Sequence, residues 1–359
     1  MIRMCETVTL VSVVVVCFNG LEITRRCLES IFSQDYQPLE IIVVDNGSQE
    51  DISGMVSREF PRAHLIRLPE NLGFAGGHNR GIEAAQGKYA AIINNDAVAS
   101  PAWIRAMVEE AEADERIGSV STVIMDGSRP DFLDSCGVGI ALDGMSRQAL
   151  RGKRPLMPDR PREVLLTSGC ACLLRMEALR IVGLFDETLF AYCEDTDLGL
   201  RLRWAGYQAV IVPGERVTHY SSMTAGKFSI QKIFWVERNH FWVAVKNFPL
   251  PLLFLAPFVT VWRFAVQVYA VAANAGEVRG FTDKTRLGEI AAAVLRAFLS
   301  ALAGIPLMLR RRKTFVGKRK ISSLQMMKLI MRFRMPITEI ILGKSDSKIP
   351  GDEQLFTSI

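Results

Sequence analysis

The chain has 359 residues and a formal net charge of +5, with 49% hydrophobic and 23% charged residues. A chain of this length and composition can bury a hydrophobic core in one large domain or two ordinary ones. This excludes a chain that is disordered throughout. Its seven cysteines are odd in number and scattered, which excludes a disulfide framework and indicates reduced thiols in a cytoplasmic compartment.

The first third of the chain alternates between strand and helix patterns. Residues 8–18 form a β-branched run that is typical of a strand covered on both faces. Further strands are predicted at 39–45, 63–69, 88–94 and 117–125, and helices at 24–34, 51–60, 75–87 and 101–113. The alternation predicts an α/β fold with a doubly wound, mostly parallel sheet and flanking helices.

The pattern changes at about residue 126. Residues 126–165 are rich in Gly, Pro, Asp and Arg, which predicts a loop-rich surface that includes a mobile flap. Regular patterning then returns, and a helix is predicted over 195–205, followed by a strand.

Two apolar stretches occupy the last part of the chain. Residues 248–262 are apolar throughout and continue past Arg263, and residues 289–313 contain a second stretch interrupted by Arg296. Each is near the length needed to span a bilayer, but each carries an Arg. Three interpretations remain open: a hairpin of two spans, interfacial amphipathic helices, or a buried helical subdomain.

The positive charge is concentrated near the C-terminus. Residues 310–334 contain ten basic residues and no acidic one. This segment indicates either a solvated basic tail or attraction to an anionic membrane surface. No nucleic-acid-binding motif accompanies it, and we expect no nucleic-acid partner.

Polar residues follow three of the predicted strands. Asn19 follows the first strand, Asp45 ends the second, and Asn94, Asn95 and Asp96 end the fourth. Each alone is an ordinary turn residue. Because ligands of parallel sheets bind at the carboxyl ends of the strands, their coincidence at one edge predicts a ligand site there.

An acidic cluster begins the predicted helix at 195–205. Glu194, Asp195 and Asp197 have a structural interpretation, since carboxylates stabilise a helix N-terminus and Asp197 can pair with Arg201 four residues later. They also have a functional one, since crowded carboxylates raise one another's pKa and favour a proton acceptor. His219 follows a strand and is either a structural residue or a ligand.

Together these segments resemble the family 2 glycosyltransferases of the GT-A fold, and most of all their bacterial rhamnosyltransferase-like branch. The resemblance covers about residues 8–225 in family order, and its motifs are VSVVVVCFNG, IIVVDNGS, ENLGFAGGHNRGI, IINNDA, GCACLLRMEAL, GLFDETLFAYCEDTDLGLRLRWAGY and VTHYSS. It implies a GT-A domain over 1–230, with a nucleotide-binding half at about 8–125 and an acceptor half at about 126–230. Residues 231–359 would form a helical, apolar and basic region associated with a membrane.

The resemblance also implies roles for individual residues. Asp195 would be the general base, Asp96 and His219 would bind a metal ion, and Gly169 and Glu194 would lie on the acceptor side. The residues expected to contact the nucleotide sugar are Phe18, Asn19, Asp45, Asn71, Gly73, Asn79, Asn94 and Asn95. Asn94 stands where the family's Asp-x-Asp motif has its first acid, so that Asp96 is the only carboxylate of the motif.

The expected activity is that of an inverting glycosyltransferase that depends on Mn²⁺ or Mg²⁺. It would move a sugar from a nucleotide-diphosphate donor, with dTDP-rhamnose as the best guess, to a cell-surface polysaccharide or lipid-linked glycan. It would act at the cytoplasmic face of the cell membrane, held peripherally or by one helical hairpin. The alternatives are a sugar nucleotidyltransferase and a non-catalytic membrane scaffold that binds nucleotide sugars.

Overall fold

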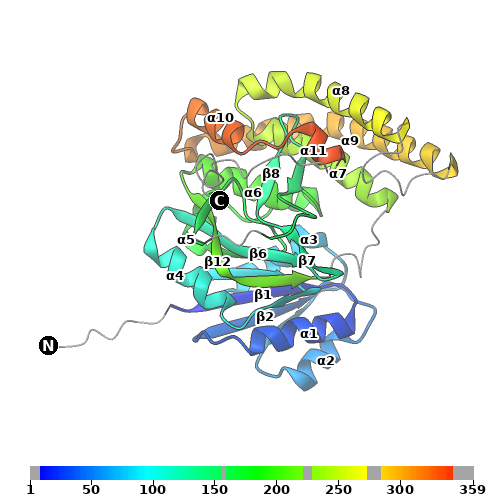
Figure 1. Ribbon diagram of the computed structural model, residues 1–359. Coiled ribbons are helices and arrows are strands. Elements are labelled where there is room, and N and C mark those ends of the chain that lie inside the picture. The colour runs from blue at the N-terminus through cyan, green and yellow to red at the C-terminus, as the bar shows by residue number, and fades with distance from the viewer. Residues whose placement is uncertain (1–8, 156–158, 221–228, 273–283, 343–359) are drawn as a thin grey trace.

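The computed structural model describes residues 9–155, 159–220, 229–272 and 284–342. A twisted sheet lies at its centre, with helices on both faces and a further helical layer at one side (Figure 1). The main path of the sheet runs in the order β10 (Arg162–Val164), β12 (Gln208–His219), β6 (Ile117–Asp126), β11 (Ala171–Arg175), β4 (Tyr89–Asn94), β1 (Val11–Cys17), β2 (Leu39–Asp45) and β3 (His64–Arg67). The five strands predicted in the first third of the chain are present.

The register of the sheet brings the polar strand ends together. β1 pairs in parallel with both β2 and β4, so that Cys17 lies opposite Asp45 and Val16 lies opposite Asn94. β11 is antiparallel to its neighbours β4 and β6, and β10 is antiparallel to β12. Six strands of the path therefore run in one direction and two run in the other. The antiparallel insertions were not anticipated from the sequence.

Helices cover both faces of the sheet because successive side chains of a strand point to opposite faces, and both faces of the central strands are apolar. Val11, Val13 and Val15 point to the face covered by α1 (Leu21–Phe32), α2 (Ile52–Glu59) and α4 (Trp103–Ala113). Val14 points to the opposite face. That second face is covered by α3 (Gly73–Ala84), α5 (Met176–Val182) and α6 (Glu194–Trp204).

The segment predicted to be loop-rich contains four short strands, so this prediction is wrong in part. β7 (Arg129–Ser135) pairs with β6, and β10 extends the sheet beyond β12. β8 (Val138–Ile140) and β9 (Ser146–Gln148) form a separate two-stranded sheet. β8, β9 and β10 have three residues each, which is too few to show a clear periodicity, and pairing with other strands supplies their hydrogen bonds. The short β5 (Ala97–Ala99) pairs with β12 just after the predicted ligand edge.

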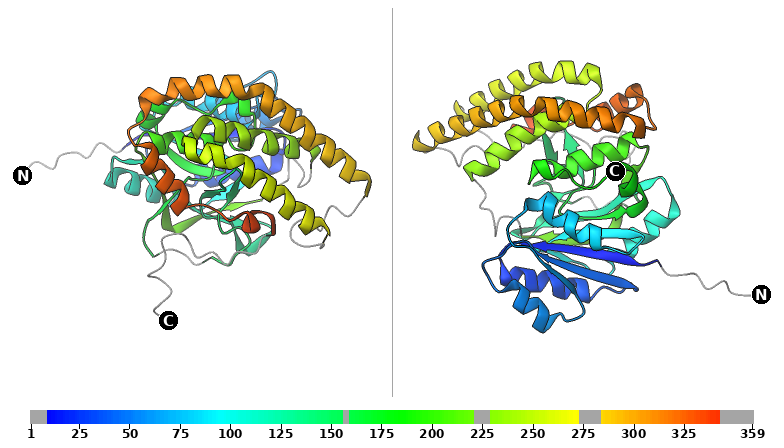
Figure 2. Two further views of the ribbon diagram at one scale, coloured as in Figure 1. Left: turned by 90° about the horizontal axis from the view of Figure 1, so that it is seen from above. Right: turned by 180° about the vertical axis from the view of Figure 1, so that it is seen from behind.

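The C-terminal helices form an outer layer over the α6 face of the sheet (Figures 1 and 2). They are α7 (Ile230–Asn247), α8 (Leu250–Ala272), α9 (Lys284–Phe315), α10 (Ser323–Arg332) and α11 (Ile337–Leu342). Trp242 of α7 donates its indole N–H to the Ala301 carbonyl of α9 at 3.0 Å. A side chain at Gly304 would lie 2.5 Å from the Trp242 ring, so glycine permits this close contact. The described parts of α7, α8 and α9 thus share a hydrophobic cluster with the helices that cover this face of the sheet.

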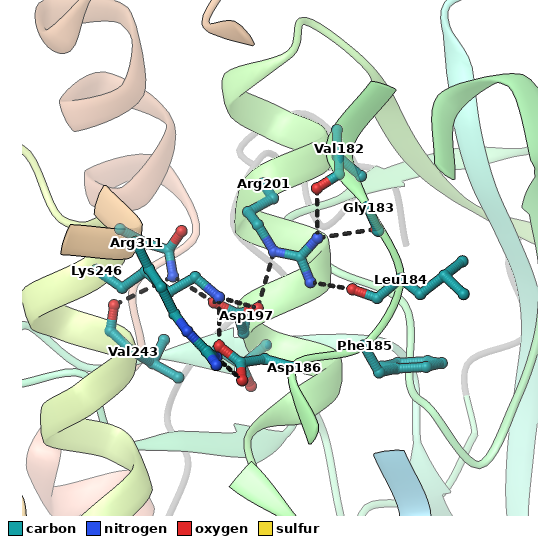
Figure 3. A network of polar contacts seen from close by, with 12 residues as sticks. Val182, Gly183, Leu184, Phe185, Asp186, Asp197, Arg201, Val243, Lys246 and Arg311 are labelled. Carbon is teal, nitrogen blue, oxygen red and sulfur yellow. Dashed lines mark hydrogen bonds and ion pairs between the residues drawn. The ribbon is translucent and has the colours of Figure 1, made fainter. Parts of the chain in front are cut away.

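A buried network of charges joins α6 to this outer layer (Figure 3). Asp197 accepts hydrogen bonds from Arg201 at 2.8 Å, as the i,i+4 spacing predicted, and from Lys246 at 2.9 Å. Lys246 also donates to Asp186 at 2.7 Å, and Arg311 of α9 pairs with the same carboxylate. Burial raises the pKa of Asp186 and Asp197, but the neighbouring cations outweigh it and hold both pKa values below the ordinary range.

Replacement of Lys246 tests this network. Lys246→Met leaves two buried carboxylates with fewer partners, and we expect the free energy of unfolding to fall by about 3–5 kcal/mol. The native carboxylates have lowered pKa values, so their contribution is present above pH ~4 and is lost as the pH falls. Denaturant unfolding at several pH values measures both effects. Lys313→Met, on the exposed end of α9, serves as the control, and equal stability of the two variants would contradict the expectation.

Candidate active site

A cavity of about 570 Å³ opens at the edge where the sequence predicts a ligand site. β4 and β12 end there, and the first turn of α6 faces the same space. Six of the predicted residues line this cavity, and they are Asn94, Asp96, Gly169, Glu194, Asp195 and His219. The structure thus brings together side chains that are up to 125 residues apart in the chain.

Asp96 and His219 contact each other at one wall of the cavity. Their elements meet because β5 pairs with the end of β12, which sets His219 opposite Ala97. Nε2 of His219 lies 3.1 Å from Oδ1 of Asp96, and Nδ1 lies 2.8 Å from Oδ2 of Asp134 on β7. Burial lowers the pKa of His219, but Cys170 and these two carboxylates outweigh it and raise the pKa well above its ordinary value.

This pair has the chemistry of a partial metal site. Two ligands in adjacent positions around a Mg²⁺ or Mn²⁺ ion lie about 3 Å apart, which matches the 3.1 Å between Asp96 and His219. A carboxylate on the second imidazole nitrogen, as Asp134 provides, is the usual partner of a metal-binding histidine. Among the described residues no group of three or more His, Cys, Asp or Glu side chains is arranged to hold a metal. An ion here would therefore need ligands from a bound substrate or water.

Asp195 occupies another wall of the cavity, in the first turn of α6. Its Oδ1 accepts a hydrogen bond from the Thr196 amide at 2.7 Å, and its Oδ2 accepts one from the Gly169 amide at 3.2 Å. A side chain at Gly169 would place its Cβ 3.2 Å from the Cβ of Asp195, so the close approach favours glycine. The two backbone donors hold the carboxylate in a fixed orientation.

Burial dominates the electrostatics of the two acids in this turn. It raises the pKa of Asp195, although the hydrogen bonds from Gly169 and Thr196 act in the opposite direction. It also raises the pKa of Glu194 well above its ordinary value, and the neighbouring Asp195 adds to the effect. The lowering expected from the helix N-terminus is thus outweighed. Within the described residues, the buried Oε2 of Glu194 has no hydrogen-bond partner.

Four of the predicted nucleotide contacts lie in the loops that follow β1 and β2, or beside them. Phe18 is 36% exposed, so its ring is accessible for stacking. Asp45 is buried and accepts hydrogen bonds from the Ser48 amide at 2.9 Å and the Ser53 hydroxyl at 2.6 Å. The side chain of Asn19 accepts from the Gln49 amide at 2.8 Å and that of Asn71 accepts from the Gly73 amide at 2.8 Å. These residues shape the loops, and their contact with a nucleotide stays a prediction.

Two other predicted contacts are used inside the protein. The Asn79 amide group donates to the Phe185 carbonyl and accepts from the Phe185 amide, each at 3.0 Å, so it fastens α3 to the segment before α6. Asn95 donates to Thr24 of α1 at 2.9 Å. Neither residue is among those that line the cavity. Their positions indicate a structural role, while a direct contact with the donor remains untested.

Several residues of the cavity were not identified from the sequence. Asp134, Arg147 and Arg151 come from the segment 126–165, and Lys232 and Ile340 come from α7 and α11. Arg151 pairs with Asp134 at 3.3 Å. The basic character of 147–154 was the one available signal, but nothing local indicated that it faces the ligand edge. Lys232 and Ile340 reach the cavity because the outer layer folds over it.

Comparison with known proteins agrees with this geometry. Residues 12–182 match the family described as glycosyl transferase family 2. The chain is 28% identical, over 241 residues that cover 60% of it and 77% of the relative, to the N-acetylglucosaminyl-diphospho-decaprenol L-rhamnosyltransferase of Mycobacterium tuberculosis (strain ATCC 25618 / H37Rv).

Solved structures confirm the predicted GT-A-type fold. The crystal structure of GalNAc-T7 with UDP, GalNAc and Mn²⁺ is similar with a TM-score of 0.57 at 16% identity, over 84% of this chain and 59% of that one. A mannosyltransferase from Pyrobaculum calidifontis in complex with GDP-Man and Mn²⁺ is similar with a TM-score of 0.50 at 20% identity, over 86% of this chain and 85% of that one.

Removal of Asp96 tests the metal site. We expect Asp96→Ala to abolish Mn²⁺ binding in the presence of a nucleoside diphosphate, because His219 alone cannot hold a hard divalent ion. Asp134→Asn should weaken the same binding by about 10–100-fold. Titration calorimetry measures both. Asp35→Asn removes an exposed carboxylate elsewhere and should change nothing, and an unchanged Mn²⁺ affinity in Asp96→Ala would remove Asp96 as a ligand.

Proposed function

We propose that this chain, whose residues 12–182 match glycosyl transferase family 2, is an inverting, metal-dependent glycosyltransferase. It transfers a sugar from a nucleotide-diphosphate donor to a cell-surface polysaccharide or lipid-linked glycan. One observation carries the proposal: the Asp96–His219 pair and the oriented carboxylate of Asp195 line the same cavity.

The donor side of the cavity is assigned to Asp96 and His219. A Mn²⁺ or Mg²⁺ ion held there would offset the negative charge that develops on the departing diphosphate. Asp134 keeps the imidazole of His219 oriented toward the cavity through its contact at Nδ1. The structures of GalNAc-T7 and the Pyrobaculum mannosyltransferase were solved with Mn²⁺, which supports a divalent ion in this chain.

The acceptor side is assigned to Asp195, Gly169 and Glu194. Asp195 takes the proton from the acceptor hydroxyl as this oxygen attacks the anomeric carbon, and burial favours this step because it raises the pKa of the carboxylate. Attack from the face opposite the diphosphate inverts the anomeric centre. The unpartnered Oε2 of Glu194 provides a hydrogen-bonding group for a hydroxyl of the acceptor.

The proposed donor is dTDP-rhamnose and the proposed place of action is the cytoplasmic face of the cell membrane. The mycobacterial relative is named a rhamnosyltransferase that acts on a diphospho-decaprenol-linked acceptor, which supports both a rhamnosyl donor and a lipid-linked acceptor. The two apolar helices α8 and α9 are long enough to associate with a membrane. The family match favours glycosyl transfer over nucleotidyl transfer or a non-catalytic scaffold.

Replacement of Asp195 tests its role as the base. We expect Asp195→Asn to bind donor normally but to transfer sugar about a hundredfold to ten-thousandfold more slowly, since the amide cannot accept the proton. Donor affinity and single-turnover transfer separate the two effects, with Asp35→Asn as the control. In the wild-type enzyme the rate should fall on the acid side at a higher pH than an ordinary aspartate would give. Near-normal turnover in Asp195→Asn would rule out this base.

A panel of nucleotide sugars tests the donor. In the presence of Mn²⁺, dTDP-rhamnose should raise the melting temperature more than UDP-GlcNAc or GDP-mannose at the same concentration, because a ligand that binds more tightly stabilises the folded state more. Stronger stabilisation by another nucleotide sugar would change the donor but not the reaction class. Release of pyrophosphate from a sugar 1-phosphate and a nucleoside triphosphate would instead indicate a nucleotidyltransferase.

A further inference from the structure

The exposed hydrophobic side chains of this protein are gathered on two helices. Among the described residues, fourteen of the eighteen large exposed hydrophobic side chains belong to α8 and α9. Phe254 and Phe258 are each 75% exposed, and Trp262 is 58% exposed. A surface of this kind marks an interaction site, because soluble proteins rarely expose large contiguous apolar patches.

The polarity of α8 is inverted relative to a helix that faces water. Its buried side recurs at helical spacing and includes Leu252, Ala256, Thr260, Arg263, Val266 and Ala270. The charged residue of the helix, Arg263, is therefore on the buried side, while the phenylalanines and Trp262 point outward. A helix that faces water shows the opposite arrangement.

Arg263 fixes this orientation. Its guanidinium is fully buried and donates to Asp143 at 2.7 Å and to both carboxylate oxygens of Glu237, each at 2.8 Å. Asp143 belongs to the segment between β8 and β9 of the catalytic domain, and Glu237 belongs to α7. If α8 crossed a bilayer alone, Arg263 would lose these partners within the hydrocarbon, which is costly. The two ion pairs of Arg263 therefore hold the middle of α8 against α7 and the segment between β8 and β9.

The helix α9 is held in the same way. Its buried side consists mainly of small residues that permit close packing on α7, and it includes Ala293, Ala297, Ala301 and Met308. Arg312 near its end donates to the carbonyls of Val245 and Phe248 at 3.0 and 2.6 Å. The outward side carries Leu295, Phe298, Leu299, Leu302, Leu307 and Leu309.

We propose that α8 and α9 form a membrane-facing plate that lies flat in the surface of a bilayer containing anionic lipids, with neither helix crossing it. This inference rests on the proposed function and specifies how the enzyme is held at the membrane. It selects the interfacial interpretation among the three that the sequence left open. The apolar side chains of the plate enter the boundary between headgroups and acyl chains. The buried sides of both helices stay on the protein.

Charge favours anionic lipid over a second copy of this chain as the occupant. Arg310 and Lys313 are exposed at the end of α9, and Lys318 and Lys320 are exposed just beyond it. The segment 310–334 contains no acidic residue, so a second copy placed on this surface would bring like charges together. Anionic headgroups offer the complementary charge. Arg296, exposed among the leucines of α9, can extend its guanidinium to the same headgroups.

The plate lies directly behind one wall of the active-site cavity. Val236 of α7 and Ile340 of α11 line the cavity. Both also pack against the apolar cluster that includes Val266 and Ala270 on the buried side of α8. A flat-lying plate therefore sets the acceptor side of the cavity close to the bilayer surface, where a sugar attached to a membrane lipid is presented.

Trp262 distinguishes a flat helix from a spanning one, because it lies at the middle of α8. We expect the full chain to bind vesicles of equimolar phosphatidylcholine and phosphatidylglycerol, with its Trp262 fluorescence quenched more by lipids brominated near the headgroup than near the bilayer centre. Trp262→Phe provides the background from the other tryptophans. Stronger quenching from the bilayer centre would place Trp262 in the middle of a span and overturn the proposal.

Substitutions on the plate test the same surface by flotation. Phe254→Ser and Phe258→Ser should each weaken vesicle binding by roughly tenfold, and Asp35→Asn, an exposed substitution outside α8 and α9, should not. Binding should weaken in high salt and in vesicles of phosphatidylcholine alone. No binding to either vesicle, or a dimer in ultracentrifugation that Phe258→Ser dissociates, would overturn the proposal. Mn²⁺-dependent donor hydrolysis by the same variants reports on the proposed function independently of membrane binding.

Discussion

The first turn of α6 carries the buried carboxylate of Asp197, and the arrangement of the active site depends on how that charge is neutralised. An unpaired carboxylate in a protein interior is too costly to persist. Arg201, Lys246 and Asn247 supply its partners, and two of these belong to α7. Asp195 lies two residues earlier in the same turn. The pairing that stabilises the fold therefore also fixes the position of the proposed base.

Aspartates close to one another in the structure behave differently because their neighbours differ. Cations surround Asp186 and Asp197 and hold their pKa values low. Asp195 instead accepts hydrogen bonds from two backbone amides, and burial raises its pKa. Asp96 instead meets the imidazole of His219, which Asp134 holds from the other side. One residue type thus provides a structural anchor, the proposed proton acceptor and the proposed metal ligand, according to the groups that surround it.

Buried ion pairs also determine which surfaces of the C-terminal helices face outward. Arg263 is satisfied inside the protein by Asp143 and Glu237, so α8 turns its phenylalanines outward. Arg311 and Arg312 fasten the end of α9 to the catalytic domain and to α7. In both helices the apolar surface that a soluble protein would bury remains exposed. These charges join the catalytic domain to α8 and α9, the helices of the proposed membrane-facing plate.

The local pattern of the sequence was sufficient to predict the strands of the first third of the chain, the helix that begins near Asp195 and the edge of the sheet, marked by Asp96, at which the cavity opens. It was also sufficient for the family, because the motifs occur in order. Such features depend on residues close together in the chain, where side-chain periodicity and strand ends are directly visible.

Only the tertiary structure decided which distant strands and side chains contact one another. It inserted β11 antiparallel between β4 and β6, brought Asp134 to His219, and placed Lys246 beside Asp197. It also turned Arg263 inward, so that a segment with the composition of a membrane span became a helix with one protein-facing side. The sign of the pKa shift at Asp195 was decided in the same way, by burial that the sequence does not display. These outcomes depend on contacts between distant segments, and packing determines which segments meet.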